Sequence, residues 1–211
     1  MSGNEILVIE NQYFGCVNWI NDLFQFTHVE IEQYEYYQKL SFRNRCVLAG
    51  ANGLIHLSVP LQNGRNQKKP LKQVLINNRE DWQKIHWRTI FSCYGKSPFF
   101  EYYQPWLAAF YQKDFHFLWD MNLSILEWLQ KVLPIPSAIG FTDIYKKDYA
   151  NEVADHRNKW LPKNFQEGKK SIQYQQVFEG KIGFQTNLSV LDLLMCEGPN
   201  TKTVLTGINK L

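Results

Sequence analysis

The chain has 211 residues, a formal net charge of +3 and 45% hydrophobic residues, which is enough for one domain with a sizeable core and no structural disulfide or metal. The mild charge argues against a nucleic-acid-binding protein, and no run reaches the roughly twenty apolar residues of a membrane span. The four cysteines are scattered without a CxxC pair and no signal peptide is recognisable, so we expect a cytoplasmic protein with reduced thiols.

The first thirty residues show a strand–helix–strand pattern. Residues 6–9 are continuously apolar, as in a strand that is buried on both faces. Residues 17–24 carry apolar side chains at helical spacing, and residues 27–31 form a second extended run. This unit predicts the start of a parallel sheet.

A β-hairpin is expected next. Residues 46–48 and 54–59 flank an Asn52-Gly53 pair, which favours the positive φ angles of a tight turn, and Pro60 ends the second arm. The apolar and polar residues of that arm alternate, so one of its faces should be buried. Residues 73–77 are expected to form one more short strand.

The middle of the chain is predicted to be helical. Apolar residues recur at i, i+3, i+4 and i+7 from Trp82 to Cys93, with Gly95 and Pro98 closing the helix. Helical spacing returns at residues 106–111 and again at 115–133.

The last third is expected to be rich in loops. After Pro134 and Pro136, residues 138–141 form a candidate strand, and residues 143–168 are polar enough to be a loop or flap. A final helix is predicted to begin with Asn187 as N-cap and to end at Gly198-Pro199, which leaves a frayed tail.

These elements predict a single α/β domain over residues 1–211. Its sheet is small and mainly parallel, with an antiparallel hairpin and a helical middle section. The expected parts are an α/β sheet unit at 1–79, a helical section at 80–133 and a loop-rich return with the final helix at 134–211.

A basic cluster precedes the hairpin and is the first candidate site. Lys39, Arg43, Asn44 and Arg45 lie within seven residues, and arginine can bind two oxygens of a phosphate or carboxylate at once. Two other interpretations stay open: an ordinary solvated basic turn, or a network of ion pairs with Glu30, Glu32 and Glu35.

Other candidates lie elsewhere in the chain. His86 falls on the apolar face of its helix, where it is either a general acid or base or a structural hydrogen-bonding residue. Asp155 and Arg157 belong to a polar run in the predicted flap, as a catalytic acid and an anion-binding arginine, although a plain solvated loop has the same composition. Gln12 follows the first strand, and ligands of parallel sheets bind beyond the carboxyl ends of strands.

Several well-known motifs are missing from the sequence. The histidines form no HxH, HxxxH or HExxH pattern, so no metal site is predicted. The chain also lacks GxSxG, a Walker loop and GxGxxG, so no particular cofactor is predicted. Asp192 falls in the first turn of the final helix, where an acid is favoured by the helix dipole alone.

Taken together, the sequence resembles the WbqC-like family of bacterial proteins over nearly its whole length, in the form with cysteine after Asn-Arg that is typical of Bacteroidetes. The resembling segments are Gln12-Tyr13-Phe14, Glu32-x-x-Glu35, Tyr37-x-Lys39, Phe42-Arg43-Asn44-Arg45-Cys46, Leu57-Ser58-Val59-Pro60, Trp82-x-x-x-His86-Trp87, Tyr94, Ser97-Pro98-Phe99-Phe100-x-Tyr102-Tyr103, Asn122, Asp155-x-Arg157, Tyr174-x-Gln176-Val177-Phe178, Asn187-x-x-x-x-Asp192 and Glu197-Gly198-Pro199.

The resemblance implies a cytoplasmic protein that is encoded, in some bacteria, among genes for O-antigen, lipopolysaccharide or other surface glycans. It suggests a transferase that acts on a sugar nucleotide or another anionic, phosphorylated small molecule. Such gene contexts suggest one reaction in particular, the transfer of an acyl or aminoacyl group to an amino sugar. The alternative is a non-catalytic binding or scaffold protein of a biosynthetic assembly. The family often has proline after the residue equivalent to Gln12, where this chain has Tyr13; if that loop shapes the pocket, the ligand differs.

Overall fold

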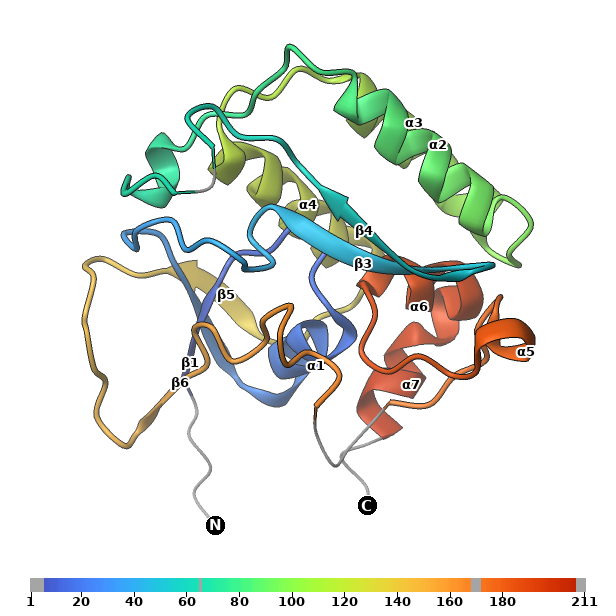
Figure 1. Ribbon diagram of the computed structural model, residues 1–211. Helices are drawn as coiled ribbons and strands as arrows, with labels where there is room; N and C mark the ends of the chain where they lie inside the picture. The colour runs from blue at the N-terminus through green and yellow to red at the C-terminus, as the bar shows by residue number, and fades with distance from the viewer. Residues whose placement is uncertain (1–5, 65, 168–171, 208–211) are drawn as a thin grey trace.

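The computed structural model describes residues 6–64, 66–167 and 172–207 (Figure 1). They form one compact α/β domain around a four-stranded sheet in the order β5-β2-β1-β6, and every neighbouring pair in that sheet is parallel. The strands are β1 (Ile6–Glu10), β2 (His28–Glu32), β5 (Ala138–Phe141) and β6 (Val153–Asp155).

The predicted strand–helix–strand unit is confirmed. β1 lies between β2 and β6, and Leu7, Val8 and Ile9 are completely buried, as their continuous apolar run requires. The helix α1 (Val17–Gln25) connects β1 to β2 and buries one apolar face, including Trp19.

The hairpin is also confirmed, with its turn one residue earlier than predicted. β3 (Arg45–Gly50) pairs antiparallel with β4 (Gly53–Ser58), so Ala51 and Asn52 make the turn. Gly53 has a φ angle of 128°, which only glycine adopts without strain, and it starts the second arm instead of closing the turn.

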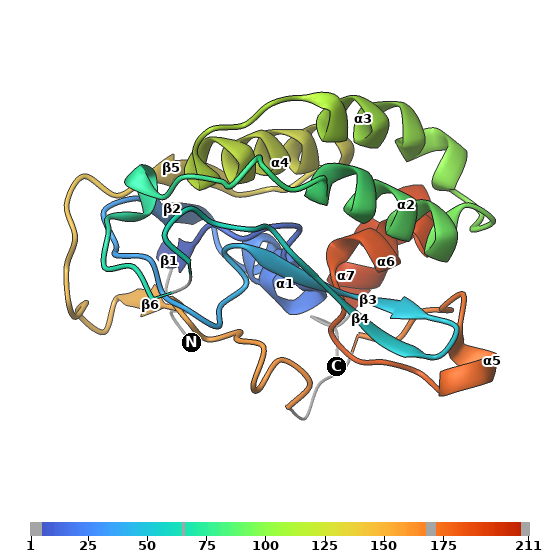
Figure 2. The ribbon, with the colours of Figure 1, turned by 45° about the horizontal axis from the view of Figure 1, so that its top comes forward.

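Three helices form the middle of the chain, as predicted. They are α2 (Trp82–Tyr94), α3 (Phe100–Gln112) and α4 (Leu118–Val132), and the second begins six residues before the predicted start at residue 106. Figure 2 shows them together on one side of the hairpin, with α2 packed against α3. Within the described ranges, no helix has both the length and the apolar composition to cross a bilayer.

Two predictions about strands were wrong. Residues 73–77 form no strand: Leu71–Gln73 is a 3-10 turn (η1), and Leu75 and Ile76 make only single bridges to Phe117 and Leu61. The predicted loop at 143–168 contains β6, whose three residues pair with β1. So short a strand gives no periodic signal, and the neighbouring strand supplies the pairing.

The carboxyl-terminal part differs from the prediction in two places. After a single helical turn, α5 (Glu179–Ile182), the helix α6 (Val190–Glu197) is capped by Ser189, since Asn187 has a left-handed φ of 54° and lies outside the helix. The predicted frayed tail holds another 3-10 turn, η2 (Gly198–Asn200), and the helix α7 (Thr201–Gly207). The remaining four residues of that tail lie outside the described residues.

Candidate functional site

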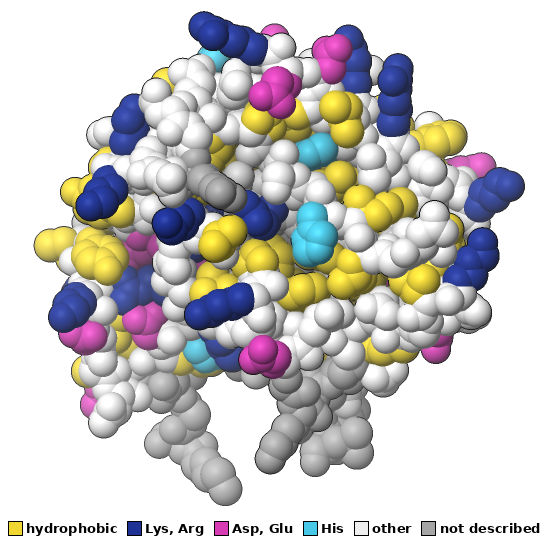
Figure 3. All heavy atoms as spheres, viewed as in Figure 1, with side chains coloured by type: hydrophobic (Ala, Val, Ile, Leu, Met, Phe, Trp, Pro, Cys, Tyr) yellow, Lys and Arg dark blue, Asp and Glu magenta, His cyan; other side chains and the backbone are white. Residues whose placement is uncertain are grey.

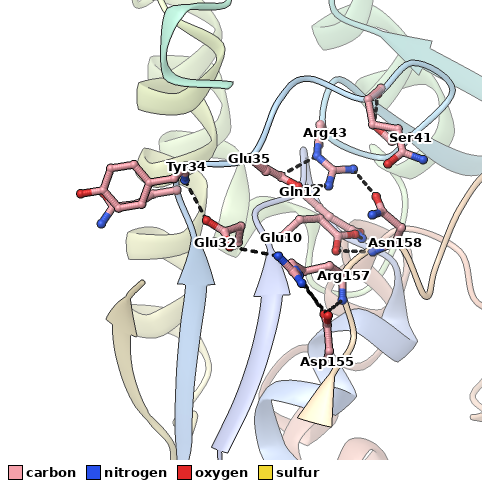
Figure 4. Close-up of polar contacts among 12 residues, drawn as sticks. Glu10, Gln12, Glu32, Tyr34, Glu35, Ser41, Arg43, Asp155, Arg157 and Asn158 are labelled. Atoms are coloured by element: carbon pink, nitrogen blue, oxygen red, sulfur yellow. Dashed lines mark hydrogen bonds and ion pairs between the residues drawn. The ribbon is translucent and has the colours of Figure 1, made fainter. Parts of the chain in front are cut away.

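The carboxyl ends of the parallel strands carry a buried cluster of charged side chains (Figure 4). Glu10 ends β1 and is paired in register with Glu32, which ends β2. They are only 1% and 0% exposed, respectively. Glu10 accepts hydrogen bonds from Gln12 Nε2 at 2.7 Å and from the backbone N–H of Asn158 at 2.8 Å. The edge of the sheet where ligands of α/β proteins bind is therefore lined by carboxylates.

Arg43 faces this cluster from the segment before β3. Its guanidinium donates to both carboxylate oxygens of Glu35 and, through Nη1, to Asn158 Oδ1 at 2.9 Å. The side chain is completely buried. Burial raises the pKa of Glu35, while the charge of Arg43 opposes that rise. Arg43 therefore forms an internal ion pair with one of the three glutamates that the sequence suggested as partners.

Arg157 holds the opposite side of the cluster. Its guanidinium binds Asp155 through Nε and Nη2, and Glu32 through Nη1 at 3.2 Å. Only 6% of the Arg157 side chain is exposed, against 31% for Asp155. Partial burial favours a higher pKa for Asp155, but the hydrogen bonds and charge of Arg157 outweigh it and hold that pKa below its usual value. Asp155 is thus an accessible, ionised carboxylate.

Two neighbouring cavities open beside the cluster. The larger has a volume of about 570 Å³ and the smaller about 290 Å³, and they share Tyr36 and Gln38. The larger one is lined by Tyr36, Tyr37, Gln38, Lys39, Asn66, Gln67 and Lys68. In Figure 3, several Lys and Arg side chains lie close together on the left half of the face shown.

The walls of the larger cavity are held together by backbone hydrogen bonds. The N–H of Tyr37 donates to the carbonyl of Lys69 at 2.8 Å, and the N–H of Leu71 donates to the carbonyl of Glu35 at 2.9 Å. Across the cavity, Lys39 Nζ lies 3.4 Å from Asn66 Oδ1. These contacts join two segments that are separated in the sequence by β3 and β4.

Two buried polar atoms near these walls have no hydrogen-bond partner among the residues described. One is Oε1 of Gln67, which lines the larger cavity, and the other is Nε of Arg45, whose charge acts on Tyr37. Gln12 Oε1, at the sheet edge, is a third such atom. Atoms of the same kind also occur elsewhere among the described residues, at Asn11, Asn21, Asn122 and Thr201, so these three do not by themselves mark a ligand site.

His86 lies in a different place, in the aromatic core between α2 and the hairpin. Its Nδ1 is 2.9 Å from the hydroxyl of Tyr13, which is 2.5 Å from that of Tyr111, and its ring also bonds the backbone of Ser58. Only 4% of His86 is exposed, and burial lowers its pKa to about 4. Its surroundings are those of a neutral, structural histidine.

The structure thus brings some of the predicted site residues together and separates others. Gln12, Arg43, Asp155 and Arg157 meet at the sheet edge, and Lys39 lines the adjacent cavity. Asn44 is buried between the Tyr37 hydroxyl and the carbonyl of Val59. Arg45 starts β3.

Glu10, Asn158, Tyr36 and Lys68 complete this region and were not chosen from the sequence. Glu10 is the last residue of the first strand, and the rule that pointed to Gln12 applied to it equally well. The described residues contain no group of three or more His, Cys, Asp or Glu placed to hold a metal ion.

Comparison with known proteins gives a family. The model of the WbqC-like protein family matches residues 13–161, which include both walls of the larger cavity and Arg157. The uncharacterized protein Rv1507c of Mycobacterium tuberculosis is 28% identical over 151 residues, which cover 71% of this chain and 59% of that protein. No solved structure gives a significant match. The chain belongs to the WbqC-like protein family.

Proposed function

We propose that this protein is a transferase of surface-glycan biosynthesis, such as O-antigen or lipopolysaccharide synthesis, and that it binds a sugar nucleotide or a related phosphorylated substrate in the larger cavity. The observation that carries the proposal is the composition of that cavity: one wall holds Lys39 and the exposed ring of Tyr36, and the other holds Lys68. Ammonium groups bind phosphate as point charges, and a tyrosine ring can stack on a nucleobase.

The size of the cavity supports the same substrate class. Its volume of about 570 Å³ lies within the roughly 300–1,000 Å³ that small-molecule sites occupy. Backbone hydrogen bonds already join the two segments that form its walls, so binding does not require these segments to be brought together first.

In this proposal, the lysines bind the phosphate, and Arg43 and Arg157 position other groups. Arg43 uses its guanidinium donors on Glu35 and Asn158 and is completely buried. The guanidinium of Arg157 donates its hydrogen bonds to Asp155, to Glu32 and to two backbone carbonyls. Within the basic cluster, the proposed anion-binding role therefore falls to Lys39 and Arg45 and not to Arg43.

Asp155 is the candidate general base. In an acyl or aminoacyl transfer, the amino group of an amino sugar attacks the carbonyl of an activated ester or thioester. A C–N bond forms, the bond to the leaving group breaks and the leaving group keeps the electron pair. Asp155, an accessible carboxylate, takes the proton that the nitrogen releases and passes it to the leaving group, so the carboxylate is restored. His86, bonded within the core, takes no part in this step.

A thermal-shift screen tests the binding part of the proposal. Its ligands are nucleoside diphosphates, their hexose conjugates, CMP-linked sugars and acyl-CoAs. We expect at least one sugar nucleotide to raise the Tm, and Lys39→Ala and Lys68→Ala to reduce that rise. Lys96→Ala, an exposed lysine outside both cavities, is the matched control. The proposal fails if no ligand raises the Tm or if the lysine variants respond like wild type.

The second candidate is a non-catalytic binding or scaffold protein. It is favoured by the internal pairing of both Arg43 and Arg157, which leaves few charged groups directed at a substrate. Product analysis by mass spectrometry distinguishes the two functions. A transferase forms an acylated sugar, and Asp155→Asn abolishes the product while ligand binding persists. A scaffold protein binds the ligand and forms no product with any donor.

A further inference from the structure

The smaller cavity has a different lining from its neighbour. It is built from carboxylates, amides and aromatic rings around two cationic side chains. Its lining residues are Glu35, Tyr36, Gln38, Tyr145, Lys147, Asp155, Arg157 and Asn158. The two cations, Lys147 and Arg157, are matched in number by the carboxylates of Glu35 and Asp155, so this lining lacks the excess of positive charge that a phosphate would need.

One wall of this cavity comes from the segment 142–152, between β5 and β6. Arg157 fastens that segment: it donates to the backbone carbonyls of Lys146 at 2.8 Å and Lys147 at 3.2 Å. Its guanidinium also lies 5.2 Å from the ring centre of Tyr145 and 5.0 Å from that of Tyr149. Arg157 thus connects the middle of this wall to the sheet edge, where Asp155 and Glu32 bind its guanidinium.

The opposite wall is rigid for a different reason. Asn158 adopts a left-handed φ of 61° and is fixed by Glu10 at its N–H and by Arg43 at its side chain. Glu35 is held at both oxygens by the same arginine. Asparagine tolerates the left-handed conformation of Asn158, and its contacts with Glu10 and Arg43 fix the position of this residue.

This lining matches a compact polyhydroxylated ligand. Ionised carboxylates and amide oxygens accept hydrogen bonds from hydroxyl groups, and Lys147 and the Gln38 amide can donate to them. Tyrosine rings offer apolar faces to the C–H groups of a sugar ring. The volume of about 290 Å³ lies at the lower limit of roughly 300 Å³ for ligand sites, which suits one ring better than a whole nucleotide.

The two cavities border each other, since Tyr36 and Gln38 line both of them. Resting on the proposed function, we infer that a single sugar nucleotide spans both cavities: the nucleotide and its phosphates lie between Lys39 and Lys68, and the sugar ring lies in the smaller cavity under Tyr145. The sugar then lies beside Asp155, the proposed general base.

Isothermal titration calorimetry of the full chain tests this assignment. The probes are UDP, GDP and dTDP, the matching hexose conjugates, and hexose 1-phosphates. We expect a conjugate to bind at least fivefold more tightly than its nucleoside diphosphate. Tyr145→Ala and Lys147→Ala should remove that increment and leave the affinity for the nucleoside diphosphate unchanged. Ile144→Ala, 63% exposed in the same segment and outside the cavity, should behave like wild type.

The outcomes separate the two proposals. If nucleoside diphosphates bind but the conjugates bind no more tightly, or if Tyr145→Ala and Lys147→Ala leave the increment intact, the sugar site is overturned and the nucleotide site stands. If only hexose 1-phosphates bind and that binding needs Tyr145, the sugar site stands and the nucleotide part of the proposed function fails. If none of the probes binds, both are overturned.

Discussion

Arg43 and Glu35 form a two-point ion pair inside the protein. Nε of Arg43 donates to Oε1 of Glu35 at 2.7 Å, and Nη2 donates to Oε2. Arg43 is 0% exposed and Glu35 5%. The pair fastens the segment after β2 to the segment before β3, and it orients Asn158 through the remaining guanidinium nitrogen. It acts as a brace under the smaller cavity.

Removing one member of this pair should destabilise the protein strongly. Glu35→Gln leaves a buried, uncompensated guanidinium, so we expect the free energy of unfolding to fall by about 3–5 kcal/mol. The double variant Glu35→Gln/Arg43→Met should recover most of that loss because neither charge remains. Urea unfolding at pH 7 measures both, with the exposed Glu127→Gln as control. If the double variant were destabilised by the sum of the losses of the two single changes, the two residues would not act as a stabilising pair.

His86 should make stability depend on pH. Burial lowers its folded pKa to about 4, below the value of about 6.5 expected in the unfolded chain. The unfolded state therefore binds more protons between these values, so the contribution is complete above about pH 6.5 and is lost as pH falls towards 4. Between pH 7.5 and pH 5.5, the free energy of unfolding of the wild type should fall by about 1 kcal/mol more than that of the His86→Gln variant. Urea unfolding at pH 7.5, 6.5 and 5.5 checks this, and parallel curves would exclude it.

Two tyrosine hydroxyls that bind the buried carboxylate of Asp192 should contribute to the stability of the protein. It is completely buried, and its carboxylate accepts from Tyr94 at 2.7 Å and from Tyr174 at 2.8 Å. Burial raises the pKa of Asp192, and these hydrogen bonds oppose the rise. Each Tyr→Phe change should cost about 1.5–3 kcal/mol, as for hydrogen bonds to charged groups. Thermal unfolding measures the loss, and Tyr102→Phe, at a ring that is 71% exposed, should have almost no effect.

The two lysines of the larger cavity should make ligand binding sensitive to salt. Lys39 and Lys68 are exposed, so their attraction to phosphate is screened as ionic strength rises. We expect each Lys→Ala variant to weaken sugar-nucleotide binding by about two- to fivefold, and both to reduce the salt dependence measured by calorimetry. Lys96→Ala should retain the wild-type dependence. Equal salt dependence in all three variants would place the phosphate elsewhere.

Local patterns in the sequence predicted much of the fold. The apolar run at Ile6–Ile9 defined a buried central strand, and the Asn52-Gly53 pair indicated the hairpin. Val153–Asp155 gave no such signal because three residues in a polar stretch show no period; their strand exists because β1 has an unpaired side to fill.

The candidate site was predicted only in part, for similar reasons. Three glutamates could have paired with the basic cluster, and only the packing of the segment after β2 selects Glu35 for Arg43. The larger cavity has walls from residues 36–39 and 66–68, two loops with no shared pattern. For His86, both interpretations fitted an apolar helix face, and the contact with Tyr13 favours the structural one.

The pairing of β1 with β6 has a consequence for how the site is assembled. Ile6 pairs on one side with His28 and on the other with Val153, so the second pairing closes a loop of most of the chain and costs more entropy than the first. Arg157 and Asn158, which follow β6, bind Glu32 and Glu10 at the ends of the neighbouring strands. We therefore expect the carboxylates of Glu10 and Glu32 to lose their hydration late in folding, because their partners arrive with the strand whose pairing costs the most entropy.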